Sequence, residues 1–179
     1  MSRFAIALLL FVIACLASGV FGAAHNQVSY SVSPEYFTKY KFHQFQISPE
    51  LPDRIGAALV GWHASWWMGI VLGVFLIPFG LLIRGTSAYF VGMLKIFVVV
   101  LVTTSIVGLL GLAVSFLTIT PVTVNGIAMY GNEISDPVSF VRAGTMHNSS
   151  YAGGLIGIIT GGVGIVRTFL RHEESPGND

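Results

Sequence analysis

Four long runs of apolar residues, separated by polar stretches, dominate the chain. Each is about as long as the roughly 20 apolar residues that cross a bilayer as an α-helix rising ~1.5 Å per residue. The pattern therefore predicts an all-α membrane protein in which residues 1–179 form one domain. Its four transmembrane helices are expected at about residues 4–24, 55–83, 89–117 and 137–171.

The first apolar run also has the features of a signal peptide. Arg3 precedes an apolar core, and the small residues at 22–24 resemble a cleavage site. Residues 12–15, which end in the single cysteine Cys15, resemble a lipobox. Because the run is long enough to span a bilayer, we favour an uncleaved helix over a removed or lipidated leader.

The first long polar stretch, residues 25–54, predicts a loop on the outer side of the membrane. Hydrophobic and polar residues alternate approximately from Phe37 to His43, and such alternation is typical of β-strands. Tyr and Phe at this density also suit the headgroup layer of a bilayer. We therefore expect a small, β-like cap at the membrane surface.

The second polar stretch, residues 118–136, predicts another outer loop. It contains two turn signals, Asn125-Gly126 and Gly131-Asn132. Asp136 can cap a helix through its side-chain oxygen, and Pro137 suits the first helical position. The last helix is therefore expected to begin at Pro137.

The orientation follows from positive charges close to the ends of the helices, because Lys and Arg stay on the cytoplasmic side of a membrane. With four spans, one side collects Arg3, Arg84, Arg167 and Arg171. This distribution predicts that both termini are cytoplasmic and that the two long loops lie outside.

Composition narrows the classes of function. Of the residues, 54% are hydrophobic and 9% are charged, so lipid is the expected solvent of this chain. A formal net charge of +1 gives no field suited to nucleic acid. The four apolar runs contain no Asp or Glu, which argues against a proton pump or a carboxylate-coupled transporter. Catalytic and phosphate-binding motifs are absent from the sequence, which disfavours an enzyme.

Small residues form stripes on two of the predicted helices. A stripe lacking side-chain bulk allows two helices to approach closely, and close packing is the main source of helix association in lipid. We expect the second and fourth helices to contact each other along these stripes, whereas a second copy or another membrane protein is the alternative partner. The glycines concerned are Gly61, Gly69 and Gly73 in the second helix and Gly153, Gly157 and Gly161 in the fourth.

Three histidines are the candidate metal ligands. His25, His63 and His147 fall near the outer ends of predicted helices, and neutral imidazoles on facing helices can bind a transition metal or a haem iron. The sequence contains no HxxxH, HExxH or CxxCH motif, which favours structural roles instead. Asn148, Ser149 and Ser150 would hydrogen-bond neighbouring helices as readily as a ligand.

Three segments carry a resemblance to known sequences. They are Ser33-Pro34-Glu35-Tyr36-Phe37-Thr38-Lys39, Ser65-Trp66-Trp67-Met68-Gly69 and His147-Asn148-Ser149-Ser150-Tyr151-Ala152-Gly153-Gly154. Together they resemble a group of uncharacterised bacterial multi-pass membrane proteins, which implies the bacterial cytoplasmic membrane as the location.

The sequence-based expectation for function is a structural or accessory membrane protein. The main alternative is a redox protein that binds haem or a metal through its outer-side histidines. A small transporter or channel subunit is a third interpretation, which Pro78 and the glycine-rich fourth helix permit.

Overall fold

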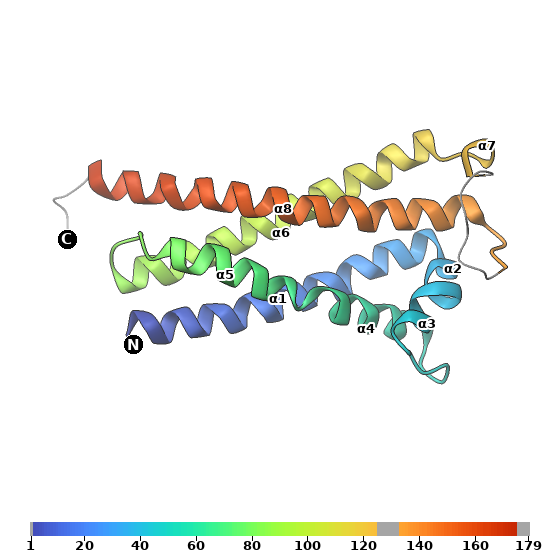
Figure 1. Ribbon diagram of the computed structural model, residues 1–179, viewed down its shortest axis with the longest axis horizontal. Coiled ribbons are helices and arrows are strands. Elements are labelled where there is room, and N and C mark those ends of the chain that lie inside the picture. Colours follow the sequence, from blue (N-terminus) through green and yellow to red (C-terminus); the bar gives the residue numbers. More distant parts are fainter. Residues whose placement is uncertain (1, 125–132, 175–179) are drawn as a thin grey trace.

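The computed structural model describes residues 2–124 and 133–174, and side chains as far as residue 170. Both turn signals predicted between residues 125 and 132 lie outside the described residues, as does the side chain of Arg171. Four helical segments are long and apolar enough to cross a membrane, which confirms the predicted all-α membrane fold (Figure 1). They are α1 (Arg3–Val32), α4 with α5 (Asp53–Ser65 and Met68–Gly80), α6 (Thr86–Thr118) and α8 (Pro137–Glu174).

The first helix extends eight residues beyond its predicted end, because the polar residues that follow the apolar run are buried. The Asn26 side chain is 2% exposed, and its Nδ2 donates to the carbonyl of Ala57 at 2.9 Å. Ser29 is fully buried. Polar residues with partners inside the bundle continue a helix that hydropathy alone would end.

The predicted β-like cap is wrong, because no strand forms in the described parts of the chain. Residues 34–44 fold into three short helices in series, which are α2 (Pro34–Tyr36), the π-helix η1 (Phe37–Lys41) and α3 (Phe42–Gln44). The Ser33 hydroxyl accepts the Tyr36 N–H at 3.2 Å and starts the first turn. Phe37 is fully buried, so one aromatic face of this helical segment packs on the bundle.

The second span is interrupted in its middle, at Trp66 and Trp67. There the N–H groups of Gly69 and Ile70 donate to the carbonyls three residues back, both at 3.0 Å, instead of four residues back. Pro78 does not lie at this interruption, because α5 ends at Gly80 and the proline is in its last turn. The last long helix begins at Pro137 as predicted, and Asp136 Oδ1 accepts the N–H of Ser139 at 3.0 Å.

The four spans form two helix pairs (Figure 1). In the first pair α1 packs along α4 and α5, and in the second pair α6 packs along α8. The predicted contact of one glycine stripe with the other does not form, although α5 and α8 do touch, and a Cβ at Gly161 would lie 3.4 Å from Leu76. A Cβ at Gly61 or Gly69 would meet the backbone of α1, at Gly22 and Cys15 respectively, and one at Gly157 would lie 2.9 Å from Val100 of α6.

All six stripe glycines are buried within the chain. Gly73 faces Phe11 of α1, and Gly153 and Gly161 face α6. The stripes therefore serve packing inside the chain.

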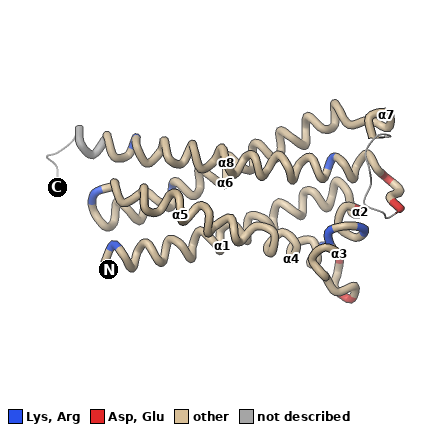
Figure 2. The backbone as a smooth tube through the Cα atoms, viewed as in Figure 1, with Lys and Arg blue, Asp and Glu red and all other residues tan. Residues whose placement is uncertain are grey.

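Charged side chains lie mainly at the two ends of the bundle (Figure 2). One end, here called the terminal end, holds the start of α1 and the connection between α5 and α6, with Arg3 and Arg84. The other, the loop end, holds α2, η1, α3 and the short α7 (Pro121–Val124). Every Asp and Glu side chain that the structure describes lies at the loop end.

Candidate functional site

Two of the three predicted histidine ligands meet between the helix pairs. His25 lies on the extended part of α1 and His147 lies on α8, and their ring centroids are 5.0 Å apart at an interplanar angle of 75°. His25 can reach this position because α1 continues beyond residue 24. Two of the three candidate ligands named from the sequence therefore lie side by side.

His63 is elsewhere. Its exposed side chain donates from Nδ1 to the carbonyl of Leu59 at 2.8 Å, within its own helix. Across the residues that the structure describes, no group of three or more His, Cys, Asp or Glu side chains is arranged to hold a metal ion. The predicted three-histidine set is therefore not brought together.

Each of the paired histidines is hydrogen-bonded to a serine of the opposite helix. His25 Nε2 lies 2.7 Å from Ser150 Oγ, and His147 Nε2 lies 3.1 Å from Ser29 Oγ. Residues four apart on α1 and three apart on α8 share a helix face, so both hydrogen bonds form across one interface. We call these four residues the His–Ser clasp.

The proton positions in one half of the clasp follow from counting donors. Ser150 Oγ also lies 3.0 Å from the carbonyl of Met146, which can only accept. A hydroxyl has a single proton, so Ser150 donates to Met146 and accepts from Nε2–H of His25. This assignment rests on the hydrogen-bond network, and it makes His25 the donor that links α1 to α8.

Glycine at position 108 of α6 leaves the space that the clasp occupies. A Cβ there would collide with Ser150 Oγ and would lie 3.6 Å from His25 Nε2. Three helices therefore meet closely at this point.

Aromatic residues of the loop end cover His147. The Tyr36 ring stacks on it at a centroid distance of 5.1 Å and an angle of 28°, and the Phe37 ring lies at 6.1 Å. Lys41 Nζ lies 5.6 Å from the centroid of the Tyr36 ring, and burial lowers the pKa of this lysine. Sequence analysis missed Tyr36, because it preceded a segment interpreted as a strand.

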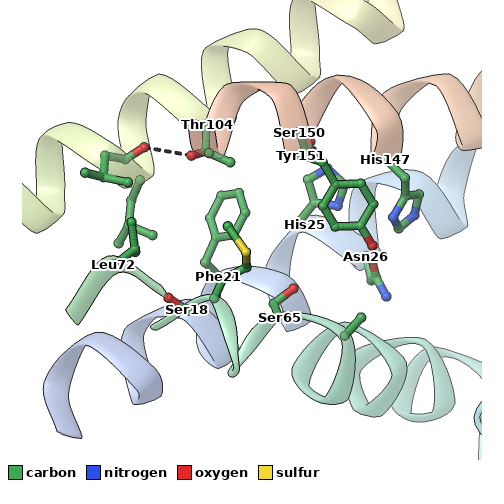
Figure 3. A pocket seen from close by; sticks show the side chains of 15 residues that line it. Ser18, Phe21, His25, Asn26, Ser65, Leu72, Thr104, His147, Ser150 and Tyr151 are labelled. Carbon is green, nitrogen blue, oxygen red and sulfur yellow. Dashed lines mark hydrogen bonds between the residues drawn. The ribbon is translucent and has the colours of Figure 1, made fainter. Parts of the chain in front are cut away.

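A cavity of about 70 Å³ lies next to the clasp (Figure 3). All four spans contribute to its wall. Its lining residues are Ser18, Phe21, His25 and Asn26 of α1, Ala64, Ser65, Met68 and Leu72 of the second span, Val100, Leu101 and Thr104 of α6, and His147, Ser150, Tyr151 and Gly154 of α8.

Hydroxyl groups are the main polar groups of this cavity, and none of the described residues that line it is charged. Thr104 Oγ1 donates to the carbonyl of Val100 at 2.8 Å. Ser18 is only 4% exposed, and its hydroxyl has no hydrogen-bond partner among the described residues. The cavity thus offers hydrogen bonds from uncharged groups.

The contact between Ser150 and His25 superficially resembles the nucleophile and base of a hydrolase. However, the Ser150 proton points to a carbonyl, and among the described residues no carboxylate is bonded to His25 to orient it. Both residues also lie inside long helices, whose backbone N–H groups are already bonded and cannot form an oxyanion hole. The geometry therefore supports hydrogen bonding rather than nucleophilic catalysis.

No protein-family model, curated protein or solved structure matches this chain.

Proposed function

We propose that this chain is a structural or accessory membrane protein in which the His–Ser clasp fastens two helix pairs together. The observation that carries the proposal is the reciprocal pairing of His25 with Ser150 and of His147 with Ser29. Hydrogen bonds between side chains of different helices stabilise membrane bundles, because lipid offers no competing partners. In this role the histidines need no cofactor.

The alternative, a haem or metal protein, finds one favourable observation in the proximity of the two imidazoles. Against it, the Nε2 atom of each ring already faces a serine hydroxyl, so a metal bound through Nε2 would have to displace these hydrogen bonds. His63 also lies apart from the pair. The competing roles of His25 and His147 can be separated by experiment.

The test is an absorption spectrum and a metal analysis of the full chain, purified in a mild detergent from cells supplied with haem and metals. We expect a colourless protein with far less than one metal ion per chain. His147→Ala should lower the midpoint of thermal unfolding, because Ser29 and the Tyr36 ring lose their partner. His63→Ala is the matched control, since it removes an exposed imidazole, and it should leave the midpoint unchanged.

Stoichiometric haem or metal that disappears in His147→Ala but persists in His63→Ala would overturn the structural role. An unchanged unfolding midpoint in His147→Ala would overturn the clasp.

We also propose that the terminal end faces the cytoplasm of a bacterial cell and that the loop end faces outward. The terminal end carries Arg3, Arg84 and Arg167, whereas the described carboxylates all lie at the loop end (Figure 2). This asymmetry fits the tendency of positive charge to remain cytoplasmic.

Single cysteines at Ser2 and Gln46, placed in a Cys15→Ser background, would test this orientation. A membrane-impermeant maleimide should label the cysteine at position 46 in intact spheroplasts and the one at position 2 only after lysis. The reverse pattern would refute the proposal.

A further inference from the structure

The cavity next to the clasp lies close to the middle of the bundle. Ser18, Ser65, Thr104 and Gly154 line it, and each is near the centre of its own span. In a membrane this position is remote from both aqueous surfaces. Polar groups at this depth are costly, so they usually have a partner or a function.

The interruption of the second span occurs beside this cavity. Gly69 N–H donates to Trp66, so the carbonyl of Ser65 does not receive the hydrogen bond that a continuous helix would give it. Interrupted helices in membranes are tolerated where they line a cavity, and in transporters such breaks form binding sites near the midplane. Ser65 and Met68, which flank the break, both belong to the cavity wall.

Ser18 supplies independent support for a ligand. It is 96% buried, because its exposed fraction is 4%, and it lines the cavity without a hydrogen-bond partner among the described residues. A molecule in the cavity that supplied a partner to this hydroxyl would gain one hydrogen bond.

The wall of the cavity is amphiphilic. Figure 3 shows His25, Ser150 and Tyr151 gathered toward one end, whereas Leu72 lies at the other end with Ser18 close to it. The apolar part is completed by Val100, Leu101 and Met68. The best match is a molecule with one polar head and one apolar stem.

Size and charge restrict the ligand further. A volume of about 70 Å³ is less than half of the ~150 Å³ cavity that holds benzene in another protein. An aromatic ring is therefore too large. The lack of charged groups among the described lining residues disfavours an ion.

We propose that this cavity binds a small uncharged alcohol, with its hydroxyl toward the Ser18 and Ser65 hydroxyls and its alkyl stem toward Leu72 and Val100. The site is distinct in role from the clasp, although His25, His147 and Ser150 contribute to both. It gives the protein a ligand-binding activity in addition to the proposed structural role.

The probe is 2-fluoroethanol, followed by ¹⁹F NMR with the full chain in detergent micelles. Partition into micelles changes the signal linearly with concentration, whereas a site produces a saturable change. We expect a saturable component in the wild type that unlabelled propan-1-ol displaces. Ser18→Ala removes one hydroxyl with little change in volume and should weaken the affinity by about fivefold, the effect of one hydrogen bond.

Two further variants make the test specific. Gly154→Ala narrows the cavity while its new methyl meets only the flexible end of Met68 at 3.4 Å, so the protein should fold and the saturable component should be lost. Ser105→Ala is the matched control, because the Ser105 hydroxyl is bonded to the carbonyl of Leu101 at 2.8 Å and does not line the cavity. It should bind like the wild type.

A purely linear response in the wild type would mean that the cavity holds only water, and it would overturn the proposal. Equal affinities in Ser18→Ala, Gly154→Ala and the wild type would place the probe elsewhere and overturn it as well.

Discussion

The closest approach of α1 and α4 gives the sharpest test of the packing. Gly22 and Gly61 face each other, so that a Cβ added at Gly61 would collide with the carbonyl group of Gly22 and would lie 2.8 Å from the nitrogen of Ala23. These neighbours are backbone atoms, which cannot rotate away as side chains do. Gly61→Ala therefore has to push the two helices apart.

The expected cost can be worked out from these contacts. Overpacking a core typically costs 1–3 kcal/mol, and rigid backbone neighbours place Gly61→Ala at about 3 kcal/mol. One turn away, Asn26 Nδ2 donates to the carbonyl of Ala57 at 2.9 Å, and separation of the helices would weaken this bond, which is worth ~1 kcal/mol. We expect a total loss of about 3–4 kcal/mol in the free energy of unfolding.

Gly162→Ala is the matched control, because the atom nearest to its new methyl would be Cε1 of Phe79 at 3.8 Å, an ordinary contact. Replacing a helical glycine by alanine there should stabilise the protein by about 0.5–1 kcal/mol. Reversible unfolding in mixed micelles, followed by circular dichroism, measures both variants. If the two free energies of unfolding differed by less than about 1 kcal/mol, the close approach of Gly22 and Gly61 would be refuted.

Three further predictions concern the ends of the bundle. Hydrogen bonds from the backbone N–H groups of residues 136 and 135 lower the pKa of Glu35, so its stabilisation is complete above the ordinary value of 4.5 and is lost as the pH falls through the lowered pKa. Glu35→Gln should therefore reduce the acid dependence of the unfolding midpoint, and an unchanged profile would contradict this. Asp136→Ala removes the cap of α8 and should cost ~1 kcal/mol in the mixed-micelle assay, whereas wild-type stability would exclude a cap. Arg3→Ala removes hydrogen bonds to the carbonyls of Leu81 and Ile83 and should speed hydrogen exchange in the first turns of α1; unchanged rates would argue against this tie.

The four spans could be predicted because each needs a long apolar surface toward lipid, and this surface appears in the sequence as a long run of apolar residues. The end of α1 could not be predicted in the same way. His25, Asn26 and Ser29 look like loop residues by hydropathy, but each has a partner inside the bundle. Hydropathy cannot distinguish a polar residue that faces water from one that is buried with a partner.

The strand prediction for Phe37 to His43 was wrong for a related reason. Alternation of aromatic and polar residues predicts a strand only where a partner strand exists, and none forms among the described residues. Here the ring of Phe37 packs instead with those of Tyr30 and Phe42 while the backbone stays helical. The conformation of a short segment of this kind depends on the surface on which it packs.

The candidate site was predicted in part. His25 and His147 were selected because imidazoles on facing helices can share a ligand, and the structure brings these two together. The expectation that Ser150 would bond a neighbouring helix is also confirmed. Ser29 carried no signal, because it fell in a stretch predicted as a loop and its partner His147 lies on another helix. Ser18 carried none, because a single serine in an apolar helix is common.

A glycine stripe on one helix does not identify the helix that packs against it. The partners that the stripes have in the structure explain where the cavity lies. A stripe indicates that a backbone can approach closely, but complementary groups on the other helix decide which one does so. Gly61 meets a second glycine, Gly22, whereas Gly157 receives the branched side chain of Val100. The close packing at glycines therefore occurs within the helix pairs. Between the pairs, the hydrogen bonds of the clasp join α1 to α8. Hydrogen-bonded side chains hold helices farther apart than facing glycines do, so space remains beside the clasp, and the cavity lies there.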